Sequence, residues 1–171
     1  MSLDPTFELV HVEQAEHWDA FVSLMREYAG TDLNNPGLSS IHDDMRHPQN
    51  RYSGLQGQAW LIQCKGQLVG CGAFTTTREA GLAELKRLYV RPTFRGRHAS
   101  RQLTLHLIEQ ARTAGFDRMG LSTWRSNTLA LSLYQRMGFT TMLAFKNHPN
   151  PDLVYLGMTL TALDPITTHT S

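Results

Sequence analysis

The chain has 171 residues, of which 41% are hydrophobic and 18% are charged, and its formal net charge is +1 at pH 7. A chain of this length can bury roughly 70% of the surface that it exposes when unfolded, so we expect a single domain over residues 1–171 with its core at about 7–160. The near-zero charge argues against nucleic acid as a partner. No apolar run approaches the ~20 residues of a membrane span, and the first residues lack a signal-peptide pattern. We therefore expect a cytoplasmic protein without a membrane partner.

The first half of the chain predicts a strand, a helix and then three strands. Residues 7–12 form the first strand, and apolar residues at helical spacing follow from Ala15 to Ala29, with Gly30 as the stop. Residues 31–57 are rich in Asn, Pro, Gly and His, so we expect one weak helical stretch at 38–46 and little contribution to the core. The next strands are predicted at 58–64, 67–76 and 82–90.

The two cysteines, Cys64 and Cys71, lie on the two strands that Lys65-Gly66 joins. A two-residue hairpin turn at that position pairs Cys64 with Gln67 and Trp60 with Cys71. In this register the cysteines are roughly 13 Å apart, at ~3.3 Å per residue, which is too far for a disulfide. We expect two free thiols buried in strands.

The second half predicts a helix, a strand, a helix and two strands. The first helix, at 100–114, carries Leu103, Leu107 and Ala111 on one face and ends at Gly115. A strand at 118–124, a helix at 128–137 and two antiparallel strands at 139–145 and 153–160 follow, the last two around an Asn- and Pro-rich loop. Strands and helices mixed in this way, without repeats or linkers, indicate one α/β domain.

A basic stretch joins the strand at 82–90 to the helix at 100–114. Residues 85–108 include no acidic residue and six cations, which are Lys86, Arg87, Arg91, Arg95, Arg97 and Arg101. A loop that enters a helix exposes amide N–H groups at the positive end of the helix dipole. Arginines beside such amides favour a bound polyphosphate.

Two motifs in the second half resemble those of a known family. They read Val90-Arg91-Pro92-x-x-Arg95-Gly96-x-x-Ala99-Ser100 and, after a strand, Asn127-x-x-Ala130-x-x-Leu133-Tyr134-x-x-x-Gly138-Phe139. In order and spacing they are similar to motifs of the GNAT superfamily of acyl-CoA-dependent N-acetyltransferases, over about residues 7–160. The resemblance implies a single-domain α/β fold whose mixed, mostly antiparallel sheet has a splay and is flanked by helices. It also implies a transferase with acetyl-CoA as its cosubstrate, and a homodimer is a state common in the family.

The resemblance implies where coenzyme A would bind. Its pyrophosphate would contact the loop and helix start formed by Arg95, Gly96, Arg97, His98, Ala99 and Ser100. The pantetheine arm would run along the strand edge near Leu88 and Val90, and Asn127 would hydrogen-bond it. His98 and Ser100 stand where the family pattern has small residues, and His tolerates a positive φ at a modest cost. We expect an effect on affinity rather than a loss of binding.

The resemblance also implies catalytic roles for two further residues. Tyr134 matches the family's general acid, which protonates the thiolate of coenzyme A, and the alternative is a core aromatic residue. Glu84 lies in Glu-Leu-Lys-Arg-x-Tyr-Val, where relatives often use the glutamate to deprotonate the acceptor amine. The alternative for Glu84 is an exposed strand carboxylate, and for Asn127 it is a helix N-cap.

The implied reaction is the direct attack of a primary amine on the thioester, with strand amides near Leu88 polarising the carbonyl. We expect residues 31–57 and the loop at 146–152 to form the acceptor pocket. A small amine or an amino acid is favoured as the acceptor, while peptide or protein amines and a non-catalytic acyl-CoA sensor are alternatives. No spacing resembles a metal-ligand cluster, and no Gly-x-Gly-x-x-Gly opens a helix, so we expect neither a metal nor a Rossmann dinucleotide site.

Overall fold

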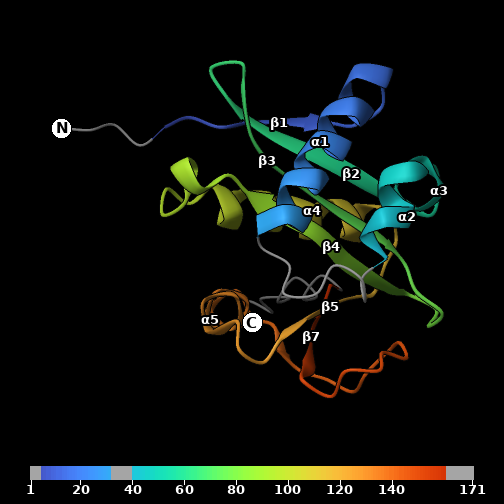
Figure 1. Ribbon diagram of the computed structural model, residues 1–171. Helices are drawn as coiled ribbons and strands as arrows, with labels where there is room; N and C mark the ends of the chain where they lie inside the picture. The colour runs from blue at the N-terminus through green and yellow to red at the C-terminus, as the bar shows by residue number, and fades with distance from the viewer. Residues whose placement is uncertain (1–4, 32–39, 161–171) are drawn as a thin grey trace, which may run out of the picture.

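The computed structural model describes residues 5–31 and 40–160, which include a seven-stranded sheet in the order β1-β2-β3-β4-β5-β7-β6 (Figure 1). The strands are β1 (Glu8–His11), β2 (Gly57–Cys64), β3 (Gln67–Thr76), β4 (Leu82–Val90), β5 (Arg118–Trp124), β6 (Thr140–Thr141) and β7 (Leu153–Thr159). Among these strands β4 and β5 are the parallel pair, and the other neighbours are antiparallel. A mixed, mostly antiparallel sheet flanked by helices confirms the expected fold class.

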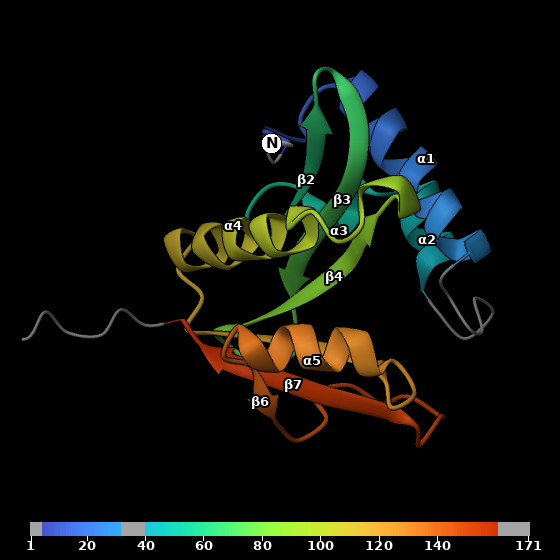
Figure 2. The same ribbon diagram turned by 90° about the vertical axis from the view of Figure 1, so that its left-hand side faces the viewer.

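Helices cover both faces of the sheet (Figures 1 and 2). One face carries α1 (Ala15–Thr31), α2 (Ile41–Arg46) and α3 (Gln49–Tyr52), and the other carries α4 (Ala99–Thr113) and α5 (Thr128–Arg136). A short 3-10 helix, η2 (Pro92–Phe94), follows β4. Apolar residues four positions apart on α4, Leu103, Leu107 and Ala111, are fully buried, as an amphipathic helix on a sheet requires. Within the described residues no helix combines the length and apolar character needed to cross a bilayer.

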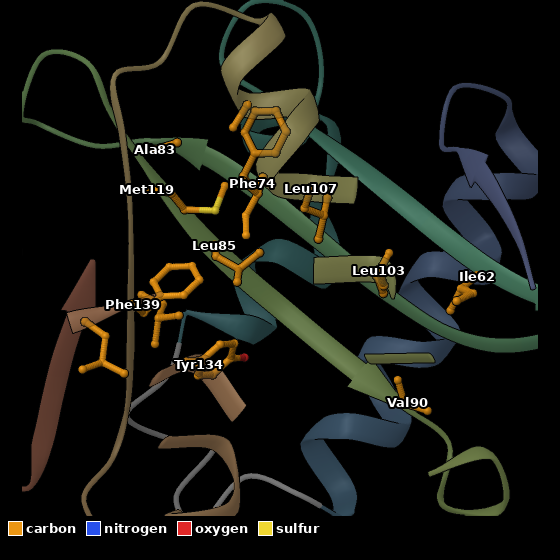
Figure 3. Packing of buried hydrophobic residues seen from close by; sticks show 14 of the residues in the cluster. Ile62, Phe74, Ala83, Leu85, Val90, Leu103, Leu107, Met119, Tyr134 and Phe139 are labelled. Carbon is orange, nitrogen blue, oxygen red and sulfur yellow. The ribbon is translucent and has the colours of Figure 1, made fainter. Parts of the chain in front are cut away.

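Each face of the sheet has its own apolar core. Side chains of β3, β4, α4 and α5 form the larger core, which includes Phe74, Leu103 and Phe139 (Figure 3). The other core lies under α1 and includes Ile41 and Tyr52, which are 0% and 1% exposed. The prediction that residues 31–57 contribute little to the core was therefore wrong, because α2 and the unpredicted α3 close this second core. The start of the helix predicted at 38–46 lies outside the described residues.

The sheet opens between β4 and β5. The two strands pair at Leu82↔Arg118, Ala83↔Met119 and Glu84↔Gly120, and the pairing then stops although both strands continue. Figure 2 shows β4 running away from the part of the sheet that contains β7. Beyond Glu84, the edge of β4 that faces β5 is left without a strand partner, as the implied splay requires.

A bulge changes the predicted register of the β2–β3 hairpin. Cys64 faces Gln67 as expected, but Cys71 faces Leu61 instead of Trp60, so the second predicted pair was wrong. The extra residue of the bulge is on β3, where two residues of one strand oppose one residue of the other. Both cysteines are free thiols, as expected, and Cys71 is buried. Cys64 is half-buried, so the expectation that both thiols are buried was wrong for Cys64.

The strand predicted at 139–145 is reduced to the two residues of β6. Beyond β6 the chain leaves the ladder, and its side chains pack on glycines of the neighbouring strands. A Cβ at Gly120 would lie 2.8 Å from Phe145 Cε1, and a Cβ at Gly157 would lie 2.5 Å from Met142 Sδ. The absence of side chains at these glycines therefore lets the segment lie across the sheet instead of extending it.

Candidate active site

A cleft of about 2000 Å³ lies where β4 and β5 diverge. Its lining comes from both strands, from Arg95, Gly96 and His98, from the first turns of α4 and α5, and from residues 144–148. We call residues 95–98 the phosphate loop. Of the site residues predicted from the sequence, Arg97 is outside this lining, and the others line it: Glu84, Leu88, Val90, Arg95, Gly96, His98, Ala99, Ser100, Asn127 and Tyr134. The fold thus brings the two sequence motifs together around one cleft.

The phosphate loop has two residues with a left-handed backbone, Gly96 with φ 77° and His98 with φ 66°. Alternation of left- and right-handed residues turns successive N–H groups toward one point, which favours an anion. His98 is the N-cap of α4 and makes no side-chain capping hydrogen bond, and no acidic residue lies in the first turn. The amides at the positive end of the helix dipole therefore lack a side-chain acceptor, and the loop fits a phosphate group.

Two cations of the basic stretch have structural partners on distant elements. Arg91 forms two hydrogen bonds to the carboxylate of Glu27 on α1, both of 3.0 Å. The Arg87 Nε is 2.8 Å from Asp44 Oδ2 on α2, and both side chains are buried. These pairs hold α1 and α2 against the sheet. The acid-free stretch in the sequence therefore overstates the charge that is available to a ligand.

Arg95 and Arg101 are the cations of the phosphate loop and of the first turn of α4 that line the cleft. Arg95 folds back on the end of β4, where its Nε donates to the Val90 carbonyl oxygen at 3.0 Å. Its guanidinium also lies 5.9 Å from the centre of the Tyr89 ring. Its position is therefore fixed by the strand that leads into the loop.

Glu84 is 6% exposed although it lines the cleft. Its Oε1 accepts a hydrogen bond from Lys146 Nζ at 2.7 Å and lies 3.8 Å from Lys86 Nζ. Lys86 is two residues along β4, and residues two apart on a strand share a face. Glu84 is therefore a buried carboxylate between two lysine amino groups, and the alternative of an exposed strand carboxylate was wrong.

Lys86 is a site residue that the sequence reasoning missed. Burial, together with the nearby Arg87 charge, lowers the pKa of Lys86 to about 7. A bulge in β4, where Arg87 has φ 60°, turns Lys86 and Arg87 toward the same side, and both donate to Ser40 Oγ, at 3.1 and 2.8 Å. The two-residue spacing from Glu84 is the sequence signal that could have identified Lys86.

Tyr134 is 9% exposed and belongs to the larger core, yet it lines the cleft. Its ring packs edge-on against Phe139, with centroids 5.6 Å apart (Figure 3). Burial raises the pKa of Tyr134, so its hydroxyl keeps its proton at neutral pH. Among the described residues this hydroxyl has no hydrogen-bond partner, so its proton is available to a ligand in the cleft.

Asn127 is the N-cap of α5, because its Oδ1 accepts from the Ala130 amide at 3.2 Å. This confirms the N-cap interpretation. The side chain also lines the cleft, where its amide nitrogen can donate to a ligand.

The end of the cleft around Glu84 is lined by Ser40 and Arg51 from the first half of the chain and by Lys146, Asn147 and His148 from the loop after β6. These belong to the two segments expected to form the acceptor pocket, and residues 32–39 of the first segment lie outside the described residues. Within the described part of the chain, no group of three or more His, Cys, Asp or Glu side chains is arranged to hold a metal ion.

Comparison with known proteins agrees with this geometry. The sequence profile of the Acetyltransferase (GNAT) family matches residues 18–139. An uncharacterized N-acetyltransferase of Schizosaccharomyces pombe is 30% identical over 149 residues, which cover 85% of this chain and 90% of that protein.

Solved structures share the fold. An acetyltransferase from Streptococcus agalactiae has a TM-score of 0.73 at 22% identity, covering 90% of this chain and 98% of that one. The PaiA N-acetyltransferase from Thermoplasma acidophilum, solved in complex with coenzyme A, has a TM-score of 0.67 at 19% identity, covering 90% and 99%. With the family profile and the S. pombe relative, the cleft and its phosphate loop lead to one assignment: the chain belongs to the GNAT family and is an acyl-CoA-dependent N-acetyltransferase.

Proposed function

We propose that the protein transfers the acetyl group of acetyl-CoA to the primary amine of a small molecule or amino acid, by direct attack of the amine on the thioester. The observation that best supports this is the cleft itself, which joins an anion-binding helix start to a buried carboxylate. Glu84 and Val90 are six residues apart on β4, or ~20 Å at 3.3 Å per residue. The phosphates and the acceptor amine can therefore occupy opposite ends of one strand.

In this proposal, the coenzyme is bound mainly by backbone groups. Amides at the start of α4, with Arg95 and Arg101, bind the pyrophosphate. The pantetheine arm hydrogen-bonds to the edge of β4 near Leu88 and Val90, where the departure of β5 leaves the strand without a partner, in the manner of an added strand. Asn127 donates to the same arm from the opposite side of the cleft.

The chemistry then proceeds in two steps. Glu84 accepts a proton from the amine, whose lone pair forms the C–N bond at the thioester carbonyl carbon. Amides near Leu88, in the β4 bulge, stabilise the negative oxygen of the tetrahedral intermediate. The C–S bond breaks, and the thiolate takes the Tyr134 proton. Solvent removes the proton from Glu84 and restores the one on Tyr134.

Direct attack agrees with the placement of the cysteines, the most nucleophilic side chains of the chain at neutral pH. Neither of them lines the cleft. Burial raises the pKa of the Cys71 thiol, which donates to the Arg87 carbonyl, so this thiol stays protonated. A cysteinyl acyl-enzyme has no support in this arrangement.

A free-thiol assay over a panel of small amines, amino acids and amine-bearing peptides tests the proposal. We expect amine-dependent release of coenzyme A, with the N-acetyl product identified by mass spectrometry, and a larger kcat/KM for the best small acceptor than for any peptide. Release that stays at the amine-free rate for the whole panel would contradict acetyl transfer to amines. A larger kcat/KM for a peptide than for any small amine would show that the acceptor is a peptide and not a small molecule.

A further inference from the structure

The lysines of this chain are distributed unevenly in space. There are three in the whole sequence, Lys65, Lys86 and Lys146. Lys65 is exposed at the turn of the β2–β3 hairpin, whereas Lys86 and Lys146 both line the cleft and both lie within 4 Å of the same carboxylate oxygen of Glu84. Two of three lysines therefore meet at the acceptor end of the cleft.

Positive charge is in excess at this end among the described residues. Asp44 is shared by Arg87 and Arg51, at 2.8 and 3.3 Å. Glu84 is shared by Lys146 and Lys86, at 2.7 and 3.8 Å. Four basic side chains thus share two carboxylates, although Lys86, with a pKa of about 7, is charged only in part at neutral pH. The Asp44 carboxylate also accepts from the Tyr52 hydroxyl. Lys86 and Arg87 are nearly buried, and buried charges are stable when they are paired, so this arrangement favours a further anion.

The excess positive charge around Glu84 and Asp44 lies at a distance from the phosphate loop. Lys86 is four residues before Val90 on β4, or ~13 Å, and the loop begins beyond η2. The phosphates that the loop and the start of α4 would bind therefore do not neutralise Lys86 and Lys146. An anion at this end has to come from the acceptor.

We propose that the acceptor amine carries a carboxylate, which Lys86 and Lys146 bind while Glu84 receives the amino group. This deepens the proposed function and rests on it. The Lys146–Glu84 pair holds opposite charges 2.7 Å apart, and an α-amino acid carries the complementary charges on two groups bonded to the same carbon. Lys146 is one-third exposed, so its side chain is free to turn from Glu84 to the incoming carboxylate. Lys86 is nearly buried and stays in place beside Ser40.

The experiment compares acceptors that differ only in the carboxylate. Amino acids are assayed for acetyl transfer beside their primary amides and their decarboxylated amines, with wild-type protein and with Lys146→Met, Lys86→Met and the control Lys65→Met. We expect wild type to favour the acid by at least tenfold in kcat/KM. Lys146→Met and Lys86→Met should each reduce this preference to below threefold, while Lys65→Met keeps it.

A binding readout separates this proposal from the proposed function. In calorimetry with protein saturated by coenzyme A, the best acid should bind at least tenfold more tightly than its amide, and Lys146→Met should lose the difference. Such binding without any acetyl transfer would contradict the proposed function while supporting the carboxylate site. Equal turnover of acid, amide and amine, or an equal loss for all three in the lysine variants, would overturn the carboxylate site while acetyl transfer stands.

Discussion

The hydroxyl of Tyr134 is buried but lines the cleft, and no neighbouring group among the described residues accepts its proton. Burial raises the pKa of this hydroxyl, and the ring is held in place by its contact with Phe139. Such a group becomes useful when negative charge develops beside it, as on a departing thiolate.

Replacing Tyr134 by Phe should leave the fold and the affinity for coenzyme A within twofold of wild type and lower the rate of the chemical step by about 10²-fold, the lower end of general acid catalysis. The rate should be measured in a single turnover, because product release can limit kcat. A single-turnover rate equal to that of wild type would make Tyr134 a packing residue.

Glu84→Gln should remove the acidic limb of the kcat/KM pH profile and keep coenzyme affinity nearly unchanged, because the side chain lies at the acceptor end of β4. The variant also leaves Lys86 and Lys146 without their shared carboxylate. The pH profile with the best acceptor is the measurement. A raised acceptor KM with unchanged kcat and pH profile would assign Glu84 to substrate binding instead.

At the scale of residues, the sequence predicted those that belong to local motifs. Asn127 and Tyr134 follow from one spacing pattern, and the N-cap at Asn127 depends on a residue only three positions away. Lys146 could not be assigned to Glu84 in this way, because the two lie 62 positions apart and meet only when residues 144–148 cross the sheet. Ion pairs between distant segments have no periodic signal in a single sequence.

At the scale of elements, we propose that the start of α4 and the phosphate loop together bind one anion, the pyrophosphate of coenzyme A. Arg95 lines the cleft and is positioned by the Val90 carbonyl, whereas the neighbouring Arg97 is outside the lining. We retain Arg97 as a weaker contributor through its charge, and two single variants measure the difference.

Arg95→Ala should weaken binding of coenzyme A by roughly tenfold, in the range of a lost charge-assisted hydrogen bond, and Arg97→Ala by less than threefold. Isothermal titration at two salt concentrations is the measurement, since a lost phosphate contact also lowers the salt dependence. Equal affinity of Arg95→Ala and wild type would show that backbone amides alone bind the phosphates.

Most elements followed from periodicity, and the errors have local physical causes. The 3.6-residue pattern located α4 and α5, and the Lys65-Gly66 turn located the β2–β3 hairpin. The β3 bulge was missed because an extra residue in a strand does not disturb the apolar pattern enough to be recognised. The shortening of β6 depends on Gly120 and Gly157, whose missing side chains accept Met142 and Phe145. A prediction made strand by strand does not include such contacts.

At the scale of the whole molecule, the buried Lys86 makes stability depend on pH. Its pKa in the folded state is lowered from 10.5 to about 7, chiefly by burial and then by Arg87, while Glu84 raises it, Lys146 lowers it and Asp44 raises it. Between these values the unfolded chain binds more protons than the folded chain. The contribution of Lys86 to the free energy of unfolding therefore increases from pH 7 to about 10 and is least favourable below pH 7.

Lys86→Met should stabilise the protein below pH 7 by up to about 5 kcal/mol, since each pKa unit corresponds to about 1.4 kcal/mol and the pKa of Lys86 is lowered from 10.5 to about 7. The gain should shrink as the pH rises toward 10. Urea unfolding at several pH values measures it, with Lys65→Met as the control. A difference between variant and wild type that stays constant with pH would contradict the burial of a charged Lys86.

The overall arrangement, a sheet that divides between β4 and β5, supports a reaction in which both substrates are bound at once. In the proposed function, coenzyme A contacts the phosphate loop and the acceptor amine contacts Glu84 at the other end of the cleft. Neither cysteine lines the cleft, where it could carry an acyl group. The central claim is therefore that the acetyl group passes from sulfur to nitrogen in one transfer.

Rapid-quench single-turnover kinetics with acetyl-labelled acetyl-CoA tests this claim most directly, with the label followed on both the acceptor and the protein. We predict that label appears on the acceptor at the rate at which acetyl-CoA disappears, that no label is carried by the protein, and that none is transferred without acceptor. Label that accumulates on the protein before it reaches the acceptor would contradict direct attack.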